Sequence, residues 1–528
     1  MLLTRLRLFH RCQQGFTTVT LMGVLMVGGL LVAASFAAVQ PDIAFTQKDE
    51  DGKQAYAAAE AGLNYYLNRL GQDNSYYLKC DQVPNPSQNA VNLQWSGTGA
   101  DPRIWQKIPG YKAEYAIELL AVQTTAPGTE QCVPNQATTM VDATTGTFRI
   151  RATGRVRTPT STTDKPYKRS IVATLRRKSF IDFLWFTDYE TQDPNAYDSG
   201  GSFTPAWAAA NCVAYRAQRN SSCADQDFIT GDSIDGPLKT NDSLSTCGSP
   251  VFGRDANDVI ELNGDDPGWV GCGSGSPTFN GTIDWPAGQL PMPQSNAELA
   301  AAADPDYTFD GETTIVLNGS NMTVTTSSGT ATMPLPANGV IYARNTSCLV
   351  GYMRQQTYAA SPGCGNVYVS GTYNSDLTIG ADNDIIIKDD LRRGGSAILG
   401  GLVANNFVRV YHPVDNWGTD WRGNPTCDNE WWGPGNIDID AAILALNHSF
   451  LTDNWYCGNA LGRLKVTGAI GQKFRGTVGT HSGGTVRTGY SKDYNYNEEL
   501  RYREPPFFVN PTEAAWRIVR QNEQVPAR

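Results

Sequence analysis

Histidine is scarce in this sequence of 528 residues, which contains only four. No two cysteines have the CxxC spacing of zinc and redox sites, and no GxSxG, HExxH or Walker A motif stands in a suitable context. Grouped aspartates do occur, but in predicted turns, where Asp side chains bond nearby backbone amides. We therefore expect a non-enzymatic protein with no catalytic residues, cofactor or metal site. The grouped aspartates are Asp304, Asp306 and Asp310, and Asp382, Asp384, Asp389 and Asp390.

Charged residues are also few, at 18% of the chain, and the formal net charge is −10. This balance disfavours a protein that binds nucleic acid over its whole surface, and leaves a local basic patch open. The aromatic content of 10% excludes a mostly disordered chain. The length predicts about two to four domains. The 52 glycines favour a turn-rich protein, and we expect an α+β, mostly β, fold class.

The cysteines indicate an oxidising compartment. One of the eleven, Cys12, lies in the basic N-terminal leader, which leaves an even number spread along the chain. Ten buried free thiols are the alternative to disulfides. Sequence does not determine connectivity, but nearest-neighbour pairing gives five short loops. These are Cys80 with Cys132, Cys212 with Cys223, Cys247 with Cys272, Cys348 with Cys364, and Cys427 with Cys457.

The N-terminus contains a long uncharged stretch. Residues 12–41 carry no charged side chain, whereas Arg5, Arg7 and Arg11 precede them. A helix of this length spans a hydrocarbon core of about 30 Å. The arginines favour a cytoplasmic leader. We predict a transmembrane helix at 16–40 in the inner, or cytoplasmic, membrane. The bulk of the chain would lie outside the cytoplasm, at the cell surface or on a pilus. An uncleaved signal anchor is the alternative.

Two segments carry a family resemblance. Residues 13–21 resemble the leader of a type IV prepilin, and residues 54–63, which include AAEAGL, resemble a stretch of PilX-type minor pilins. The resemblance implies that residues 1–15 are a leader. A prepilin peptidase would cut between Gly15 and Phe16, and Phe16 would then be N-methylated. It also implies other pilin subunits as partners. Major pilins carry Glu five residues into the mature chain, where this sequence has Thr20, so a rare subunit at a filament end is favoured.

The next part of the sequence predicts a stem and a small head. Apolar residues from Ala55 to Leu70 recur at three- and four-residue spacings, which predicts a stem helix at 41–71. Period-two alternation at 112–122, 147–156 and 167–177 predicts an antiparallel, pilin-like β head at 72–178. Residues 148–178 carry ten Lys and Arg against one acid. They are candidate contacts for DNA or an acidic glycan, although a solvated strand face explains the same pattern. The candidates are Arg149, Arg151, Arg155 and Arg157.

The rest of the chain predicts a large distal domain. Residues 179–225 are interpreted as a hinge or linker. Short β runs at 226–489, separated by Gly, Asn and Asp, favour a parallel β-helix, with a β-sandwich as the alternative. Residues 490–528 are expected to form a C-terminal cap that includes a short amphipathic helix at 511–521. A tryptophan-rich loop is a candidate surface for glycans or cell-surface partners. Its tryptophans are Trp417, Trp421, Trp431 and Trp432.

These features together predict a non-enzymatic, membrane-anchored, pilin-like protein of a type IV pilus or related filament. It would display a disulfide-stapled β domain for assembly initiation or adhesion. Two alternatives remain open from the sequence: an uncleaved, signal-anchored surface adhesin, and a surface enzyme that acts on polysaccharide through the β-helix.

Overall fold

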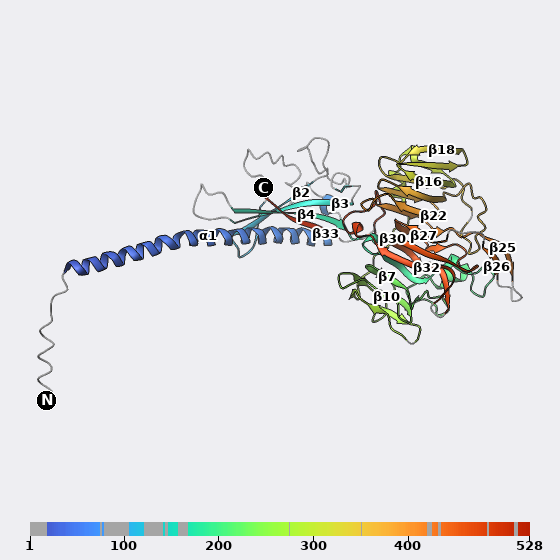
Figure 1. Cartoon of the computed structure of the whole chain (residues 1–528), viewed down its shortest axis with the longest axis horizontal. Helices are drawn as coiled ribbons and strands as arrows, with labels where there is room; N and C mark the ends of the chain where they lie inside the picture. Colours follow the sequence, from blue (N-terminus) through green and yellow to red (C-terminus); the bar gives the residue numbers. More distant parts are fainter. Residues whose placement is uncertain are drawn as a thin grey trace, which may run out of the picture.

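The computed structural model describes residues 18–73, 76–78, 105–120, 141–142, 146–156, 167–273, 275–349, 351–419, 425–430, 435–482, 485–511 and 516–527. Figure 1 shows a long helix, a small sheet along the second half of this helix, and a large strand-rich body beyond the sheet. The body consists of large curled sheets. The expectation of a mostly β chain is therefore confirmed.

Helix α1 (Thr18–Gln72) is one continuous element of 55 residues. The predicted membrane span at 16–40 and the predicted stem at 41–71 both fall largely within it. Among the residues that the structure describes, no helix meets the length and mean-hydropathy criterion for a membrane span. The apolar stripe predicted for the stem is buried against the sheet, apart from the half-buried Leu67. Its buried members, at most 3% exposed, are Ala55, Ala59, Leu63, Tyr66 and Leu70.

The small sheet has the strand order β1-β2-β3-β4-β33, and all its pairings are antiparallel. Strands β3 and β4 have the bounds that the sequence predicts. Helix α1 packs across this sheet so closely that a Cβ on Gly154 of β3 would overlap the backbone of Ala55. The strands are β1 (Gln106–Lys107), β2 (Ala113–Leu120), β3 (Thr147–Val156), β4 (Tyr167–Arg177) and β33 (Trp516–Gln524).

The C-terminal helix predicted at 511–521 is wrong, because the chain forms strand β33 there. This strand adds to the edge of β4 in antiparallel register. Trp516 contacts Phe148 edge to face, with ring centroids 4.6 Å apart, and so completes the core between the sheet and α1. The short apolar pattern fits either element, and pairing with a strand about 340 residues earlier decides it. Residues 516–527 therefore belong to the head, not to a cap on the distal domain.

The distal body is built from parallel ladders of short strands, as expected for a β-helix and not for a sandwich. In one ladder, side chains at the same register position stack from strand to strand. Each stacked residue is at most 2% exposed, so each rung buries its apolar side chain between its neighbours. The stack is Ile341, Ile379, Leu402, Ile443, Ile470, Trp185, Leu238 and Ile260.

The chain enters this solenoid in the middle of the stack. Strand β5 pairs with β8 on one side and with β30, almost the last strand, on the other. A lower arm then leads through β8 and β11 to β14. The chain next crosses to the opposite end and returns through β15, β19, β21, β23 and β28 to β30. The solenoid is thus inserted between β4 and β33 of the head.

The strands of the entry and lower arm are β5 (Trp185–Gln192), β6 (Phe228–Ile229), β7 (Ser233–Asp235), β8 (Leu238–Thr240), β9 (Leu244–Cys247), β10 (Val251–Phe252), β11 (Val259–Glu261), β12 (Trp269–Gly271), β13 (Thr278–Phe279) and β14 (Thr282–Asp284). The upper arm begins with β15 (Thr308–Asp310), β16 (Thr313–Gly319), β17 (Asn321–Thr326), β18 (Gly329–Pro334), β19 (Val340–Arg344), β20 (Val367–Tyr373), β21 (Leu377–Ala381), β22 (Ile385–Arg393), β23 (Gly400–Ala404) and β24 (Val408–Val410). It continues with β25 (Val414–Thr419), β26 (Pro425–Glu430), β27 (Ile437–Ile439), β28 (Ala442–Ala445), β29 (Phe450–Thr452), β30 (Ala460–Arg475), β31 (Gly479–Ser482) and β32 (Thr485–Tyr496). The short helices are η1 (Tyr76–Leu78), η3 (Phe180–Asp182), η4 (Pro194–Ala196), α3 (Pro205–Asn211), α4 (Ala297–Ala302), η5 (Pro305–Tyr307) and η6 (Glu498–Arg501).

Residues 179–225 are not a hinge between domains. Their first part enters the solenoid core, where Phe180, Leu184 and Phe186 are at most 1% exposed. The aromatic residues interpreted as a linker are therefore the starting rung, and the solenoid begins about 40 residues before the predicted boundary at 226.

A strap at residues 285–307 connects the two ends of the solenoid by running across the rungs. Asn296 is 1% exposed and fixes the strap to several rungs. Its amide nitrogen donates to the carbonyls of Ala381 and Val403, each at 3.1 Å, and its amide oxygen accepts from the Tyr342 hydroxyl at 2.6 Å. Asn405 accepts from the Asn296 backbone N–H at 2.8 Å. The strap therefore ties successive rungs together along one flank.

Four disulfides lie in the solenoid, and they are the nearest-neighbour pairs that the sequence predicts. The predicted Cys80–Cys132 pair lies outside the described residues. The four bonds are Cys212–Cys223, Cys247–Cys272, Cys348–Cys364 and Cys427–Cys457.

Candidate assembly surface and interdomain junction

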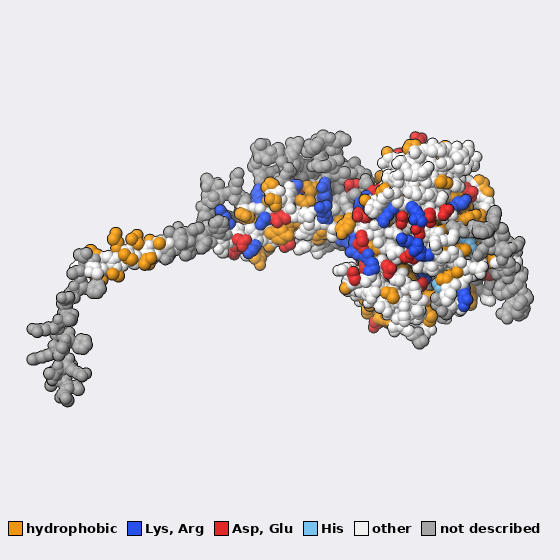
Figure 2. Space-filling model, in the orientation of Figure 1, with side chains coloured by type: hydrophobic (Ala, Val, Ile, Leu, Met, Phe, Trp, Pro, Cys, Tyr) orange, Lys and Arg blue, Asp and Glu red, His pale blue; other side chains and the backbone are white. Residues whose placement is uncertain are grey.

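The first half of α1 exposes an apolar surface. Its large side chains, nine in the described part, are 52–71% exposed, in contrast to the buried stripe of the second half. Figure 2 shows them as an orange band on the part of the helix that projects away from the sheet. Thr20 lies at the start of this surface and is exposed. Gly15 and Phe16, the predicted processing residues, lie outside the described residues. The apolar residues are Leu21, Met22, Val24, Leu25, Met26, Val27, Leu30, Leu31 and Val32.

The basic strand β3 uses part of its charge inside the head. The Arg151 guanidinium lies 2.9 Å from the Glu118 carboxylate. Arg155 lies 2.7 Å from the carboxylate of Glu114, and its guanidinium stacks over the Trp105 ring at 3.8 Å. Both arginines are buried, at 9% and 8% exposure. The positive charge available to an acidic ligand is therefore smaller than the sequence suggests.

The other predicted ligand-binding residues are only partly described. Arg149 on β3 is exposed, whereas Arg157 lies outside the described residues. The backbone of Trp417 lies in β25, which forms an antiparallel hairpin with β26. Trp421, Trp431 and Trp432 lie outside the described residues. The described structure therefore gives no geometry for an aromatic binding surface on this loop.

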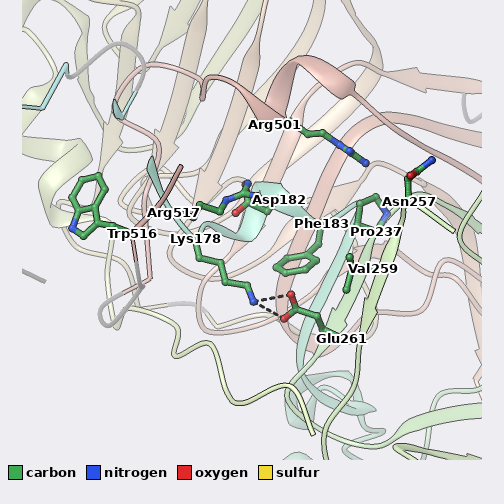
Figure 3. Close-up of a pocket in the computed structure, with 10 residues that line it drawn as sticks. All are labelled: Lys178, Asp182, Phe183, Pro237, Asn257, Val259, Glu261, Arg501, Trp516 and Arg517. Carbon is green, nitrogen blue, oxygen red and sulfur yellow. Dashed lines mark hydrogen bonds and ion pairs between the residues drawn. The ribbon is translucent and has the colours of Figure 1, made fainter. Parts of the chain in front are cut away.

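A pocket of about 370 Å³ lies where the head meets the solenoid (Figure 3). Lys178 follows β4 and lies 2.7 Å from both carboxylate oxygens of Glu261 on β11. Lys239 of β8 contacts the same carboxylate at 3.0 Å. On the other side of the pocket, Asp182 pairs with Arg517 of β33 at 2.5 Å. Two head strands, β4 and β33, connect to the solenoid. Ion pairs at the end of β4 and in β33 therefore join the head to the solenoid.

Burial shifts the titration of several groups at this junction. Arg176 is fully buried, pairs with Asp182, and donates to the Leu500 carbonyl at 2.6 Å. Burial lowers its pKa to about 10. Burial also raises the pKa of Glu504 to about 7, although Arg176 opposes that shift. Burial lowers the pKa of Lys239, and Glu261 partly offsets this effect. The junction is built as a network of buried, mutually compensated charges, which suits it to hold two parts in a fixed relation.

The grouped aspartates have protein partners. The Asp382 carboxylate lies 2.6 Å from the Tyr342 hydroxyl and shares its single proton with the Asn296 oxygen, and Asp384 lies 3.1 Å from the Arg409 guanidinium. Asp310 pairs with Arg344 at 3.0 Å. In the described part of the chain, no three His, Cys, Asp or Glu side chains are arranged to hold a metal ion. The turn interpretation holds for Asp382 and Asp384, which lie between β21 and β22, but it is wrong for Asp310, Asp389 and Asp390, which lie in strands β15 and β22.

The sequence did not predict two buried polar pairs. His448 lies 3.0 Å from Asp193, and Arg409 lies 3.0 Å from Asp453. The first pair joins positions 255 residues apart and the second joins positions 44 apart. No local motif marks either pair, because ladder stacking alone brings the partners together.

Comparison with known proteins identifies no family for this chain. No family model matches it, and no curated protein matches it. Among solved structures, the competence-associated pilin ComZ from Thermus thermophilus matches with a TM-score of 0.27 and 11% sequence identity. That match covers 90% of this chain and 98% of the ComZ chain. A TM-score this low does not establish a common fold, so no functional assignment follows from it.

Proposed function

We propose that this protein is a membrane-anchored, minor pilin-like subunit of a type IV pilus or related filament. The observation that carries the proposal is the division of α1. Its second half buries a stripe against the head, whereas its first half exposes nine large apolar side chains. An exposed apolar surface of this length is costly in water and calls for lipid or neighbouring apolar helices. The resemblance of residues 13–21 to a prepilin leader supports this interpretation.

The same proposal includes processing and location. A prepilin peptidase in the inner membrane cuts between Gly15 and Phe16, and Phe16 is methylated. The first half of α1 then serves as the single membrane-spanning anchor, and the rest of the chain lies outside the cytoplasm. The four disulfides of the solenoid support an oxidising compartment. PilX-type minor pilins are the subgroup suggested by AAEAGL at 58–63.

The position in the filament follows from size and charge. Thr20 supplies no carboxylate for a neighbouring N-terminal ammonium, which is costly to leave unpaired in an apolar bundle. The solenoid lies beyond the head, at the end of the molecule opposite the exposed part of α1 (Figure 1). Copies stacked directly above would collide with it. We therefore place the protein at filament ends, where the solenoid initiates assembly or meets a target surface without enzymatic activity.

Mass spectrometry of the mature N-terminus tests the proposal most directly. In cells with an active prepilin peptidase, we expect a chain that begins with methylated Phe16. Gly15→Leu should leave the precursor uncut, whereas Gly23→Leu, a matched change inside α1, should not. A wild-type chain that begins at Met1 would contradict the proposal and favour an uncleaved signal anchor.

Immunogold labelling with antibodies against the solenoid tests the filament position. We expect sparse labelling at filament ends. Continuous labelling along filament sides would contradict an end position. If Thr20→Glu were incorporated to the same extent as the wild type, the missing carboxylate at position 20 would not explain that position.

A further inference from the structure

A second pocket, of about 340 Å³, lies on the flank of the solenoid. Three segments that are distant in sequence form it: residues 195–205 after β5, residues 352–357 before β20, and Tyr456 after β29. Pockets for small ligands begin at about 300 Å³, so one or two compact rings fit this volume. The pocket is separate from the junction in Figure 3 and from the exposed surface of α1, and its occupancy goes beyond the proposed function.

Disulfides hold two of the three segments in place. The residues from 352 to 357 lie within the loop closed by Cys348–Cys364. Tyr456 immediately precedes Cys457, which is bonded to Cys427. In the segment at 195–205, the Tyr197 hydroxyl lies 3.7 Å from the sulfur of Cys212, whose disulfide lies outside the segment. Two of the four described disulfides therefore restrain walls of the cavity, which limits the ordering cost when a ligand binds.

Hydrogen bonds add to this rigidity. The Gln356 N–H donates to the side-chain oxygen of Asn454 at 2.8 Å, and the Asn454 amide nitrogen donates back to the Gln356 carbonyl at 3.0 Å. Two residues beyond Gln356, the Tyr358 hydroxyl donates to Asp453 at 2.9 Å. Asp453 is fully buried and paired with Arg409. The loop that forms one wall is thus fixed to the core of the solenoid.

The charges that line the pocket cancel. Its only charged side chains are Asp198 and Arg354, whose nearest oxygen and nitrogen lie 3.5 Å apart. The Arg354 guanidinium also stacks over the Tyr456 ring at 4.1 Å, which leaves it little freedom to reach a separate anion. An anionic ligand would therefore meet Asp198 as well as Arg354, and the pocket does not favour one.

The polar groups of the lining disfavour a purely apolar ligand. The Tyr352 hydroxyl is buried and makes no hydrogen bond to any described residue, while its ring packs against Phe407 at 4.3 Å. Because this hydroxyl has almost no accessible surface, a ligand in the cavity would contact the Tyr352 ring and not its hydroxyl. The amides of Asn195 and Gln355 and the hydroxyl of Thr357 add donors and acceptors to the same cavity.

We propose that this pocket binds a neutral saccharide. A pyranose ring combines hydroxyls that both donate and accept hydrogen bonds with C–H faces that pack on aromatic rings. Those two features match the lining: tyrosine rings with Met353 and Pro205 as the apolar part, and a neutralised Asp198–Arg354 pair with amides and hydroxyls as the polar part. Carboxylate and guanidinium groups make stronger hydrogen bonds to ligand hydroxyls than neutral groups do.

Saturation-transfer NMR on the purified full chain tests this proposal without any filament. The ligands are the methyl glycosides of glucose, galactose, mannose and N-acetylglucosamine, with methyl glucuronide as the anionic comparison. We expect at least one neutral glycoside to bind with a Kd of about 1 mM, in the range of small ligands with few contacts. Asp198→Asn should weaken that binding about tenfold.

Asp198→Asn is the sharpest variant, because it keeps the size of the side chain and removes the charge that faces Arg354. The exposed Asp306, which is not part of the lining, provides a matched control, and Asp306→Asn should leave binding unchanged. Absence of binding by all four neutral glycosides at about ten times the expected Kd would overturn the proposal. Undiminished binding by Asp198→Asn, or tighter binding of the glucuronide, would also overturn it.

Discussion

Glu504 makes the stability of the junction depend on pH. This residue lies on the segment that leads from the solenoid back to the head and is 3% exposed. One carboxylate oxygen accepts from the Asn510 amide at 3.2 Å, and the other has no hydrogen-bond partner among the described residues. Arg176 and Arg177 of β4 are the charged groups that lower its pKa, but burial outweighs them and raises the pKa from 4.5 to about 7.

The sign of the effect follows from this raised pKa. The folded state favours the protonated acid, so the stabilising contribution is fully present below about pH 4.5 and is lost as the pH rises through about 7. At 1.36 kcal/mol per pKa unit, the change from 4.5 to about 7 corresponds to about 3 kcal/mol. Glu504→Gln, which keeps the shape of the protonated acid, should therefore be more stable than the wild type above pH 8 by up to this amount. Near pH 4 the two proteins should be similar.

Urea unfolding of the full chain between pH 4 and 9, combined with hydrogen exchange of residues 498–511, measures this difference. Hydrogen exchange is needed because a chain with several structural units does not unfold in one step. Glu499→Gln, on an exposed carboxylate of the same segment, controls for the loss of an acid. If Glu504→Gln showed the same pH dependence as the wild type, the carboxylate would not be desolvated and the reasoning would be refuted.

Three further perturbations test the packing. Asn296→Ala removes three side-chain hydrogen bonds and should cost about 3 kcal/mol, seen as faster hydrogen exchange at residues 285–307; the exposed Asn321→Ala should not change it. Gly154→Val should force α1 away from β3 at a cost of about 1–3 kcal/mol, seen as faster proteolysis within residues 50–70; unchanged proteolysis would contradict the close packing. Cys348→Ser should lower stability by about 3 kcal/mol and abolish glycoside binding; retained binding would show that the loop is rigid without its disulfide.

Sequence patterns locate the elements whose partners are near in the chain. Strands β3 and β4 alternate over 10 and 11 residues, and their predicted bounds match the structure. The stem stripe and the nearest-neighbour disulfides also depend on short separations. The solenoid is recognisable because each rung has the same short apolar run, and a register shift would expose the stacked residues. In each of these cases, the structure that the local pattern predicts is also the one that the contacts with near neighbours stabilise.

The sequence predictions are wrong where a partner far away in the chain determines the secondary structure. Ala515, Ile518 and Val519 have the spacing of one face of a helix, whereas Trp516 and Ile518 share one face of a strand, and only the free edge of β4 selects the strand. The aromatic run after Lys178 reads as a linker because its ladder partner, β30, follows about 280 residues later. The saccharide pocket is equally hidden, since its three walls share no motif and meet only through the fold.

The insertion of the solenoid makes completion of the head depend on the solenoid. Closing a flexible loop of the length between Arg177 and Trp516, about 340 residues, costs about 5 kcal/mol in chain entropy. The folded solenoid removes most of this cost, because its entry strand β5 and the late strand β30 are neighbours in the stack. Strand β33 can then pair with β4 and place Trp516 over Phe148. Until the solenoid has folded, that part of the head core stays uncovered. The head would therefore be complete only in molecules whose solenoid is correctly folded.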